Sequence, residues 1–383
     1  MTDVLHDLGR GLPGTVTYKG VLAQGSGRWD ATHQAARAMA AKPPPAHHDS
    51  AGLFYGAPAV AFALHTAGHP AYRTALETLD EALTILAARR LSAAEQRMDS
   101  GRPPRMREYD LISGLTGLGA YFLYRKSRPE SLHGVLRYLV RLLQQPVKVG
   151  ANEMPGWWTS DSPTGHPDDT WPVGHGNFGM AHGIAGPVAL LARASRAGHT
   201  VAGQLETLAA SCQLLEHWAQ PEPDGGAAWP ETVSLDTWLA GPSPRFRAGR
   251  PSWCYGTPGI ARALQLAATA CDRGGSRSRA EALLAACLSD PVQLSRLTDP
   301  TVCHGWAGLC LAADRAAADA DADSPLHRTL PSLRAQFTAH LAHNPLPESA
   351  GLLTGADGVL LTIHTLSPSR PVASGWETCL LLH

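Results

Sequence analysis

Charge of one sign, closely spaced cysteine pairs and long apolar runs are all scarce in this sequence. Its 32 Lys and Arg residues nearly balance 33 Asp and Glu residues, which gives a formal net charge of −1. Such a balance provides no long-range attraction to nucleic acid or to anionic lipid. We therefore expect a small or peptidic partner and no nucleic acid.

The other two absences concern the compartment. No stretch reaches the roughly 18 consecutive apolar residues of a membrane-spanning helix, and residues 1–7 have neither the basic start nor the apolar core of a signal peptide. The seven cysteines are odd in number and show no close pairs, which favours reduced thiols or metal ligands over a disulfide framework. These features predict a cytoplasmic protein without an integral membrane segment.

What the sequence does contain is a repeated motif, Gly-x-x-Gly, followed each time by an apolar run. Five copies begin at glycines 114, 183, 256, 305 and 355, and a degenerate copy, Gly56-Ala-Pro-Ala59, precedes them. Successive first glycines lie 49 to 73 residues apart. Each interval is long enough for two helices and their loops, which is typical of stacked helical hairpins.

The pattern predicts an all-α fold, an α/α toroid whose inner helices follow the glycines and whose outer helices lie between the copies. The outer helices are expected where apolar and charged residues mix at helical spacing, in residues 71–91, 130–145, 201–219, 278–289 and 326–343. We expect one domain over residues 1–383. Six glycine turns can be traced, so the ring has six hairpins, or seven if the poorly marked first fifty residues supply another.

Two long inserts interrupt the repeat, at about residues 146–178 and 220–252. Both are rich in Pro, Gly and Trp, and we expect loops and short β-hairpins there. Because they precede the third and fourth glycine turns, counted with the degenerate copy at Gly56, we expect them to overhang the mouth of the ring. The alternative is that they only decorate a repeat protein, although loops of this length are often functional.

The chemistry is expected at two of the glycine motifs. Trp253-Cys254-Tyr255-Gly256 and Cys303-His304-Gly305 place three soft ligands at equivalent positions. Structural zinc is usually held by four protein groups, whereas catalytic zinc keeps one position open. Cys254, Cys303 and His304 therefore predict a catalytic zinc site, against the alternative that buried cysteines act as small apolar residues.

These motifs resemble the lanthionine synthetase C-like (LanC) cyclases of lanthipeptide biosynthesis, from about residue 50 to the end of the chain. The matching segments are Asp110-Leu-Ile-Ser-Gly-Leu-Thr-Gly, Met180-Ala-His-Gly-Ile-Ala-Gly, Trp253-Cys-Tyr-Gly-Thr-Pro-Gly, Cys303-His-Gly-Trp-Ala-Gly and Trp376-Glu-Thr-Cys-Leu-Leu-Leu. The resemblance implies a seven-hairpin toroid with a catalytic zinc ion. It also implies addition of cysteine thiols of a precursor peptide to dehydroalanine or dehydrobutyrine, which forms lanthionine and methyllanthionine rings.

The resemblance assigns four further residues to the active site. His182, just before Gly183, matches an acid/base histidine, and histidine suits proton transfer near neutral pH. Asp110 is expected to orient His182, to hold a proton or to cap the next helix. Arg250 and Tyr255 match an active-site arginine and tyrosine, and Arg250 could stabilise enolate charge or hold Asp110. Arg245 and Arg247 compete for the arginine role.

The leading hypothesis is thus a zinc-dependent peptide cyclase acting on a dehydrated precursor peptide, with a dehydratase and a transporter as further partners. The first alternative is a related enzyme that adds glutathione or another small thiol. A carbohydrate-active toroid would need a carboxylate pair at the glycine turns, yet only Asp110 and Asp357 lie near them. A non-catalytic zinc scaffold that binds peptide would need a fourth protein ligand.

Overall fold

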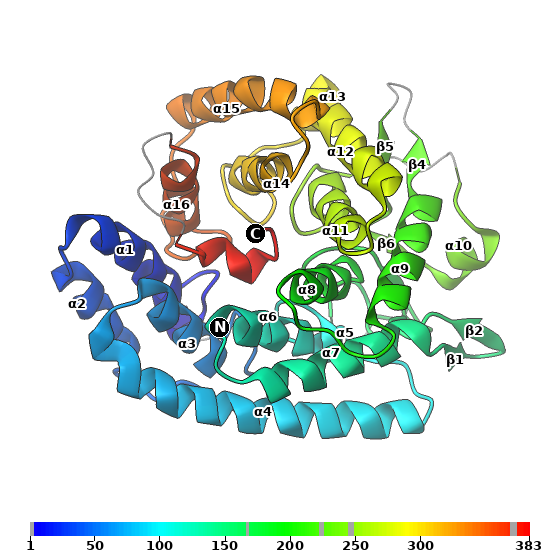
Figure 1. Cartoon of the computed structure of the whole chain (residues 1–383), viewed down its shortest axis with the longest axis horizontal. Coiled ribbons are helices and arrows are strands. Elements are labelled where there is room, and N and C mark those ends of the chain that lie inside the picture. Colours follow the sequence, from blue (N-terminus) through cyan, green and yellow to red (C-terminus); the bar gives the residue numbers. More distant parts are fainter. Residues whose placement is uncertain (1–3, 166–167, 222–225, 244–248, 368–373) are drawn as a thin grey trace.

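The computed structural model describes residues 4–165, 168–221, 226–243, 249–367 and 374–383, and these form the predicted α/α toroid (Figure 1). Within them, seven inner helices line the ring: α1 (Leu12–Ser26), α3 (Ala57–Ala67), α6 (Leu115–Arg125), α8 (Ala185–Arg196), α11 (Thr257–Ala270), α14 (Trp306–Ala318) and α16 (Ala356–Leu366). Each contacts the next in this order, and α16 contacts α1. The ring is therefore closed and has seven inner helices.

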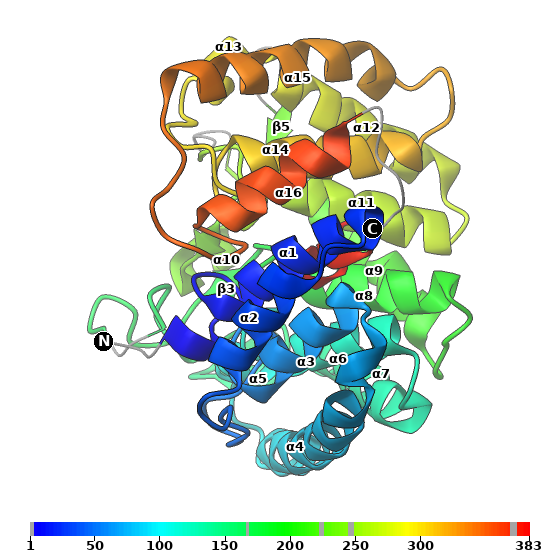
Figure 2. The same cartoon turned by 90° about the vertical axis from the view of Figure 1, so that its left-hand side faces the viewer.

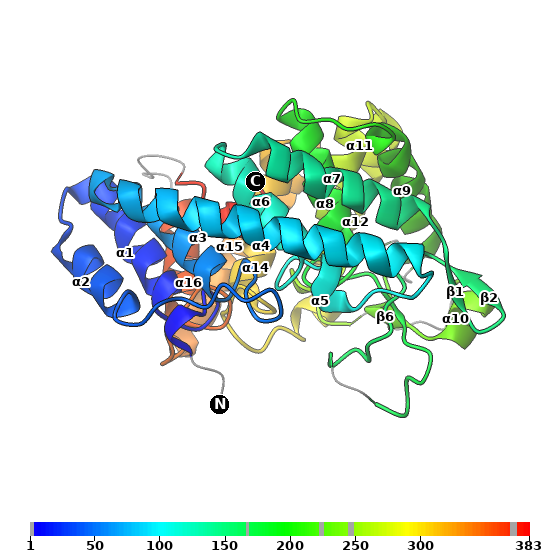
Figure 3. The same cartoon turned by 90° about the horizontal axis from the view of Figure 1, so that it is seen from below.

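Six further described helices form the outer wall; the first of them was not predicted from the sequence, and the other five fall in or around the predicted amphipathic stretches. They are α2 (Asp30–Met39), α4 (Arg73–Asp99), α7 (Pro129–Gln144), α9 (Gln204–Trp218), α12 (Gly274–Ser289) and α15 (Pro325–His343). Helix α4 runs along the outside of the ring (Figure 3). None of the described helices combines the length and the hydrophobicity that crossing a membrane requires.

The first hairpin corrects the count of six glycine turns. Gly11-Leu12-Pro13-Gly14 is a seventh copy of the motif and begins α1. The copy is hard to recognise because the residues after Gly14 include Thr15, Thr17 and Lys19 and lack the uniformly apolar character of the other copies.

The inserts contain the expected short hairpins and also a helix that the sequence did not predict, α10 (Leu235–Ala240). Strands β1 (Val147–Val149) and β2 (Asn152–Met154) form one hairpin, and β4 (Gln220–Pro221) pairs with β5 (Ala227–Ala228). Strand β3 (Gly176–Asn177) of the first insert pairs with β6 (Thr232–Val233) of the second. The ring of Trp238 in α10 also stacks on that of Trp218 in α9, with 5.2 Å between the ring centroids. The two inserts thus pack against each other and against α9.

Short helical segments complete the chain: η1 (Val4–His6), η2 (Pro70–Tyr72), α5 (Met106–Tyr109), α13 (Pro291–Leu294) and η3 (Trp376–Leu380). The last of these leads to the C-terminal end inside the ring, away from strand β3 and helix α10 (Figures 1 and 2). The Trp253 indole donates a hydrogen bond to the Leu380 carbonyl at 3.0 Å, and Arg262 Nε donates to the Leu382 carbonyl at 3.0 Å. The C-terminal segment is therefore fixed to α11 and to the residue before Cys254.

A closed chain of backbone hydrogen bonds joins the seven glycine turns. We number the residues of each turn backwards from its first glycine, so that Cys254 and Cys303 are at position −2. In each turn the backbone N–H of residue −2 or −3 donates to a carbonyl of the neighbouring turn, at 2.9–3.2 Å: Leu8 to Phe54, Phe54 to Ile112, Leu111 to Ala181, Ala181 to Cys254, Cys254 to Cys303, Cys303 to Leu353 and Leu353 to Gly9. This hydrogen-bond ring fixes each turn relative to the next.

At Gly308 and Gly358 the second glycine of the motif is required because two backbone segments approach closely there. A Cβ atom on Gly308 would lie 1.9 Å from the Val302 carbonyl oxygen, and one on Gly358 would lie 1.9 Å from the Leu352 carbonyl oxygen. Both carbonyls belong to residues six positions earlier, just before the turn. The repeated spacing therefore reflects a close approach that the backbone cannot relieve by moving a side chain.

We expect Gly308→Ala to lower the free energy of unfolding by about 3 kcal/mol, because the backbone at Val302 must shift to admit the methyl group. Gly275→Ala is the matched control, since a Cβ atom at this α12 position meets no atom within 4 Å. Its effect should be below about 1 kcal/mol. Denaturant unfolding followed by circular dichroism measures both, and equal stabilities would contradict the close approach as the reason for the glycine.

Candidate functional site

The hydrogen-bond ring places the three predicted metal ligands side by side. Cys254 and Cys303 occupy position −2 of consecutive turns, and the Cys254 N–H donates to the Cys303 carbonyl at 3.2 Å. His304 follows at position −1. The two Sγ atoms and one imidazole nitrogen all lie within 4.8 Å of one another.

This donor set fits zinc. Bonds of about 2.3 Å to sulfur and about 2.0 Å to nitrogen in a tetrahedron separate the ligand atoms by roughly 3.5–3.8 Å. Small side-chain rotations would bring the three atoms to that spacing. A second group of possible ligands, His47, His48 and Asp49, is exposed and lies in the loop before α3.

The surroundings of the two cysteines act on their pKa values in opposite directions. A hydrogen bond from Cys303 lowers the pKa of Cys254 despite burial, and the same bond raises the pKa of Cys303. This hydrogen bond thus favours the thiolate form of Cys254 over that of Cys303. Burial lowers the pKa of His304, and the charge of Arg250 acts in the same direction against the opposing effect of Asp299. A neutral imidazole is the form that binds a metal ion.

His182 and Asp110 form a second functional pair. The Asp110 carboxylate is buried, and its Oδ2 lies 2.6 Å from His182 Nδ1. Its Oδ1 accepts hydrogen bonds from the backbone N–H groups of Ser113 and Gly114 at 2.7 and 2.8 Å. Asp110 therefore both orients His182 and stabilises the turn before α6, which combines two of the alternatives that the sequence left open.

His182 is the one titratable group of this pair with solvent access. Its side chain is 34% exposed, and with Nδ1 bonded to Asp110 the free nitrogen is Nε2. Burial lowers the pKa of His182, but the Asp110 charge and hydrogen bond outweigh burial, so that the pKa is raised overall. The negative charge of Cys254 adds to this increase. The pair therefore favours a protonated imidazole near neutral pH.

Tyr255 lies between the acid pair and the metal ligands. It occupies position −1 between the turns of His182 and His304, and its ring centroid is 6.3 Å from that of His182. Burial raises the pKa of its hydroxyl group, which stays protonated. Arg250 is near enough for its charge to act on both cysteines and on His304. Its competitors Arg245 and Arg247 lie outside the described residues.

Two residues at position −6 were missed in the sequence. The Asp299 carboxylate lies 3.7 Å from His304 Nε2. Asn177 forms a hydrogen bond to the Tyr255 side chain that partly offsets the rise in its pKa. The backbone carbonyls of both residues accept a hydrogen bond from the residue after the first glycine, Trp306 and Ile184 respectively. Aligning the repeats at position −6, and not only at the glycines, would have singled them out.

The geometry brings all seven predicted site residues to four consecutive turns at one end of the ring. Two thiols and an imidazole meet as candidate metal ligands, and a histidine whose side chain is partly exposed lies one turn away. Such an arrangement can activate a sulfur nucleophile on one side and deliver a proton on the other.

Three comparisons with known proteins agree on the family. The model of the family described as lanthionine synthetase C-like protein matches residues 4–381. The nisin biosynthesis protein NisC of Lactococcus lactis subsp. lactis is 23% identical over 240 residues, which are 62% of this chain and 55% of that protein. The match thus spans about half the length of this curated relative.

A solved structure supports the fold independently. The structure titled nisin cyclase superposes with a TM-score of 0.78 at 19% identity, covering all of this chain and 93% of that chain. This likeness concerns the toroid, whereas the family match extends over nearly the whole sequence. The chain belongs to the lanthionine synthetase C-like protein family.

Proposed function

We propose that the protein is a zinc-dependent lanthipeptide cyclase, which adds cysteine thiols of a dehydrated precursor peptide to dehydroalanine or dehydrobutyrine. The observation that carries the proposal is the meeting of Cys254, Cys303 and His304 within 4.8 Å, one turn away from the His182–Asp110 pair. Family membership and the likeness to nisin cyclase support the same activity.

The ligand set suits an ion that keeps one position for substrate. Among the described residues the group contains three ligands, and a substrate thiol is the natural fourth. A zinc ion bound there would lower the pKa of a coordinated thiol, whose unperturbed value is about 8.5. Two thiolates and a neutral imidazole leave such a site electron-rich, which keeps the substrate sulfur nucleophilic.

The protein's own residues complete the addition. The substrate sulfur bonds to the β-carbon of the dehydro residue, and the electron pair of the double bond moves toward the α-carbon and its carbonyl as an enolate. His182 donates the proton from Nε2 to the α-carbon, while Asp110 holds the ring through Nδ1. We assign Arg250 and the Tyr255 hydroxyl to stabilising the enolate oxygen. The thiol proton that was lost balances the proton gained, so the product is an isomer of the substrate.

The alternative functions predict different products. Addition of glutathione or another small thiol would increase the mass of the peptide by that of the thiol, whereas ring closure leaves the mass unchanged. A non-catalytic scaffold would bind the peptide and change neither its mass nor its number of free thiols. Assembly with a dehydratase and a transporter, and a cytoplasmic location, belong to the proposal as the setting in which a dehydrated peptide would be supplied and exported.

We expect the purified protein to contain one zinc ion per chain and Cys303→Ala to lose it, because two ligands hold a zinc ion poorly. Cys310→Ala is the control, since Cys310 is buried in α14 outside the ligand group. Elemental analysis measures the zinc content. Chelation should remove the ion without loss of helical signal, because the hydrogen-bond ring and the core do not depend on it. Loss of helicity on chelation would identify the zinc as structural.

With a dehydrated precursor peptide, wild-type protein should consume free peptide thiols without changing the peptide mass. His182→Ala should retain zinc but lower the rate by about 10²–10⁴, because the proton donor is lost. The residual rings should have mixed stereochemistry at the α-carbon. Thiol alkylation with mass spectrometry and chiral analysis of the thioethers measure these effects. A wild-type rate and stereochemistry in the variant would refute the role of His182.

We expect Asp110→Asn to move the alkaline limb of the pH–rate profile to lower pH. The catalytic form of His182 is protonated, so activity falls as the pH rises through its raised pKa. Removing the Asp110 charge leaves burial as the main influence and lowers that pKa. Cyclisation rates between about pH 6 and 9 measure the shift. If the limb stays in place although the rate changes, a group other than His182 supplies the proton.

A further inference from the structure

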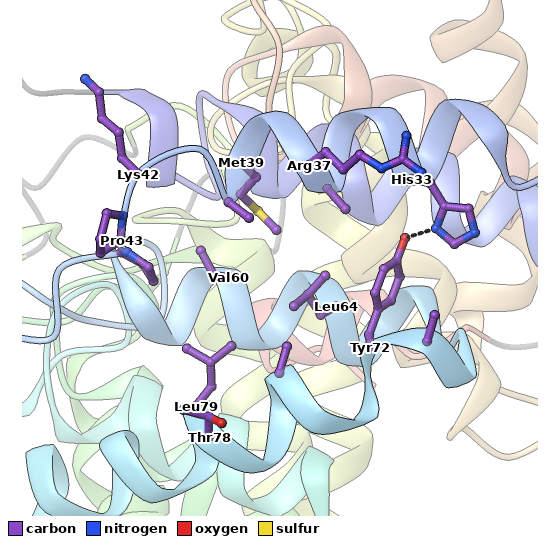
Figure 4. A pocket seen from close by; sticks show the side chains of 15 residues that line it. His33, Arg37, Met39, Lys42, Pro43, Val60, Leu64, Tyr72, Thr78 and Leu79 are labelled. Atoms are coloured by element: carbon purple, nitrogen blue, oxygen red, sulfur yellow. Dashed lines mark hydrogen bonds between the residues drawn. The ribbon is translucent and has the colours of Figure 1, made fainter.

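A large apolar pocket opens on the outer wall of the ring, in the first two hairpins. Its floor consists of Val60 and Leu64 of α3 with Leu79 of α4, and Met39 of α2 covers it from the other side (Figure 4). Its volume is about 730 Å³, within the roughly 300–1,000 Å³ of typical ligand sites. None of the residues of the predicted zinc site lines it. We call it the α2–α4 pocket.

Both ends of the α2–α4 pocket are polar, and both carry cations. Lys42 lies beside Pro43 at one end, while Arg37 and His33 lie at the other end, near Tyr72 (Figure 4). The Tyr72 hydroxyl is 2.8 Å from His33 Nδ1. No acidic residue is among those that line the pocket.

The two permanent cations at these ends are Arg37 and Lys42. Within the described residues, no carboxylate lies within ion-pair distance of Arg37 or Lys42. Both residues are exposed, so each can meet a ligand without a large desolvation cost. The pocket thus presents an apolar centre between two unneutralised positive ends.

We propose that the α2–α4 pocket binds an amphipathic peptide segment in which acidic side chains flank apolar ones. A ligand that matches the pocket needs an apolar body and two separated anionic groups. A fatty acid has one anionic group and would leave one cationic end unmatched. A peptide with apolar side chains on one face and Asp or Glu on either side meets all three requirements, as in the docking of amphipathic helices in grooves.

The pocket would give the proposed cyclase a second hold on its peptide substrate. This part of the inference rests on the proposed function. A peptide anchored outside the ring presents its reacting residues to the zinc site at an effective concentration set by the intervening chain, which reaches millimolar for short flexible connections. Binding at the pocket is measured without catalysis, so failure of one proposal does not entail failure of the other.

The test uses a labelled 14-residue peptide with Leu at helical i, i+3, i+4 and i+7 positions and Glu at the flanking positions. A second peptide with the same Leu positions carries Lys in place of Glu. Fluorescence anisotropy with the zinc-loaded full chain should show binding of the Glu peptide at least about tenfold tighter than of the Lys peptide. Equal affinities would overturn the charge argument.

Two kinds of variant locate the binding. Ala75→Trp fills the pocket from the exposed side of α4, and Arg37→Glu with Lys42→Glu reverses its ends. Each should weaken binding of the Glu peptide about tenfold or more. The matched controls on α4, Ala88→Trp and Arg89→Glu, are exposed and do not line the pocket. They should change the affinity less than about twofold.

Circular dichroism and zinc content confirm that each variant is folded. An affinity that Ala75→Trp leaves unchanged would place the peptide elsewhere and overturn the proposal. Decanoate serves as the single-headed amphiphile. Binding of decanoate that is sensitive to Ala75→Trp, with no binding of the Glu peptide, would assign the pocket to another ligand class and also overturn it.

Discussion

Seven backbone hydrogen bonds between neighbouring glycine turns determine where every functional group of this protein lies. Because each turn donates to the next through position −2 or −3, the side chains at positions −1 and −2 recur around one end of the ring. Cys254 and Cys303 are 49 residues apart in the sequence, yet they are adjacent because their turns are consecutive. The closeness of these candidate metal ligands is thus a property of the ring and needs no loop of its own.

The same ring separates the two tasks of the proposed reaction. The two cysteines and His304, whose pKa is lowered, occupy two consecutive turns. His182 lies on the turn before them, and Asp110 on the turn before that raises its pKa. Tyr255 lies between His182 and His304. Each group keeps a different protonation state because its immediate surroundings differ. Burial and the Arg250 charge lower the pKa of His304 despite the Asp299 carboxylate at 3.7 Å, whereas a carboxylate at 2.6 Å raises the pKa of His182.

Much of this architecture could be predicted from the sequence, because a close approach of two backbone segments leaves a visible trace. A Cβ atom at Gly308 or Gly358 would lie 1.9 Å from a backbone carbonyl oxygen, so these positions keep glycine and the motif is visible in the sequence. The turn at Gly11 was missed because the residues after it are less apolar. Asp299 and Asn177 were missed because no steric requirement fixes the residue type at their positions, as it does at the glycines. The packing of the Trp238 helix and the shape of the α2–α4 pocket depend on side chains from segments distant in sequence, which local patterns do not encode.

Closure of the ring also orders events during synthesis. Helix α1 packs between α3 and α16, and α16 ends 340 residues after α1 does. At about 5–20 residues per second, translation of that interval takes roughly 20–70 s. Once α3 has been made, it covers one side of α1, while the side that will contact α16 stays uncovered. The nascent protein is therefore an open arc with apolar edges at both ends. An open solenoid can stop growing at any repeat, whereas this protein is finished only when its last inner helix meets its first.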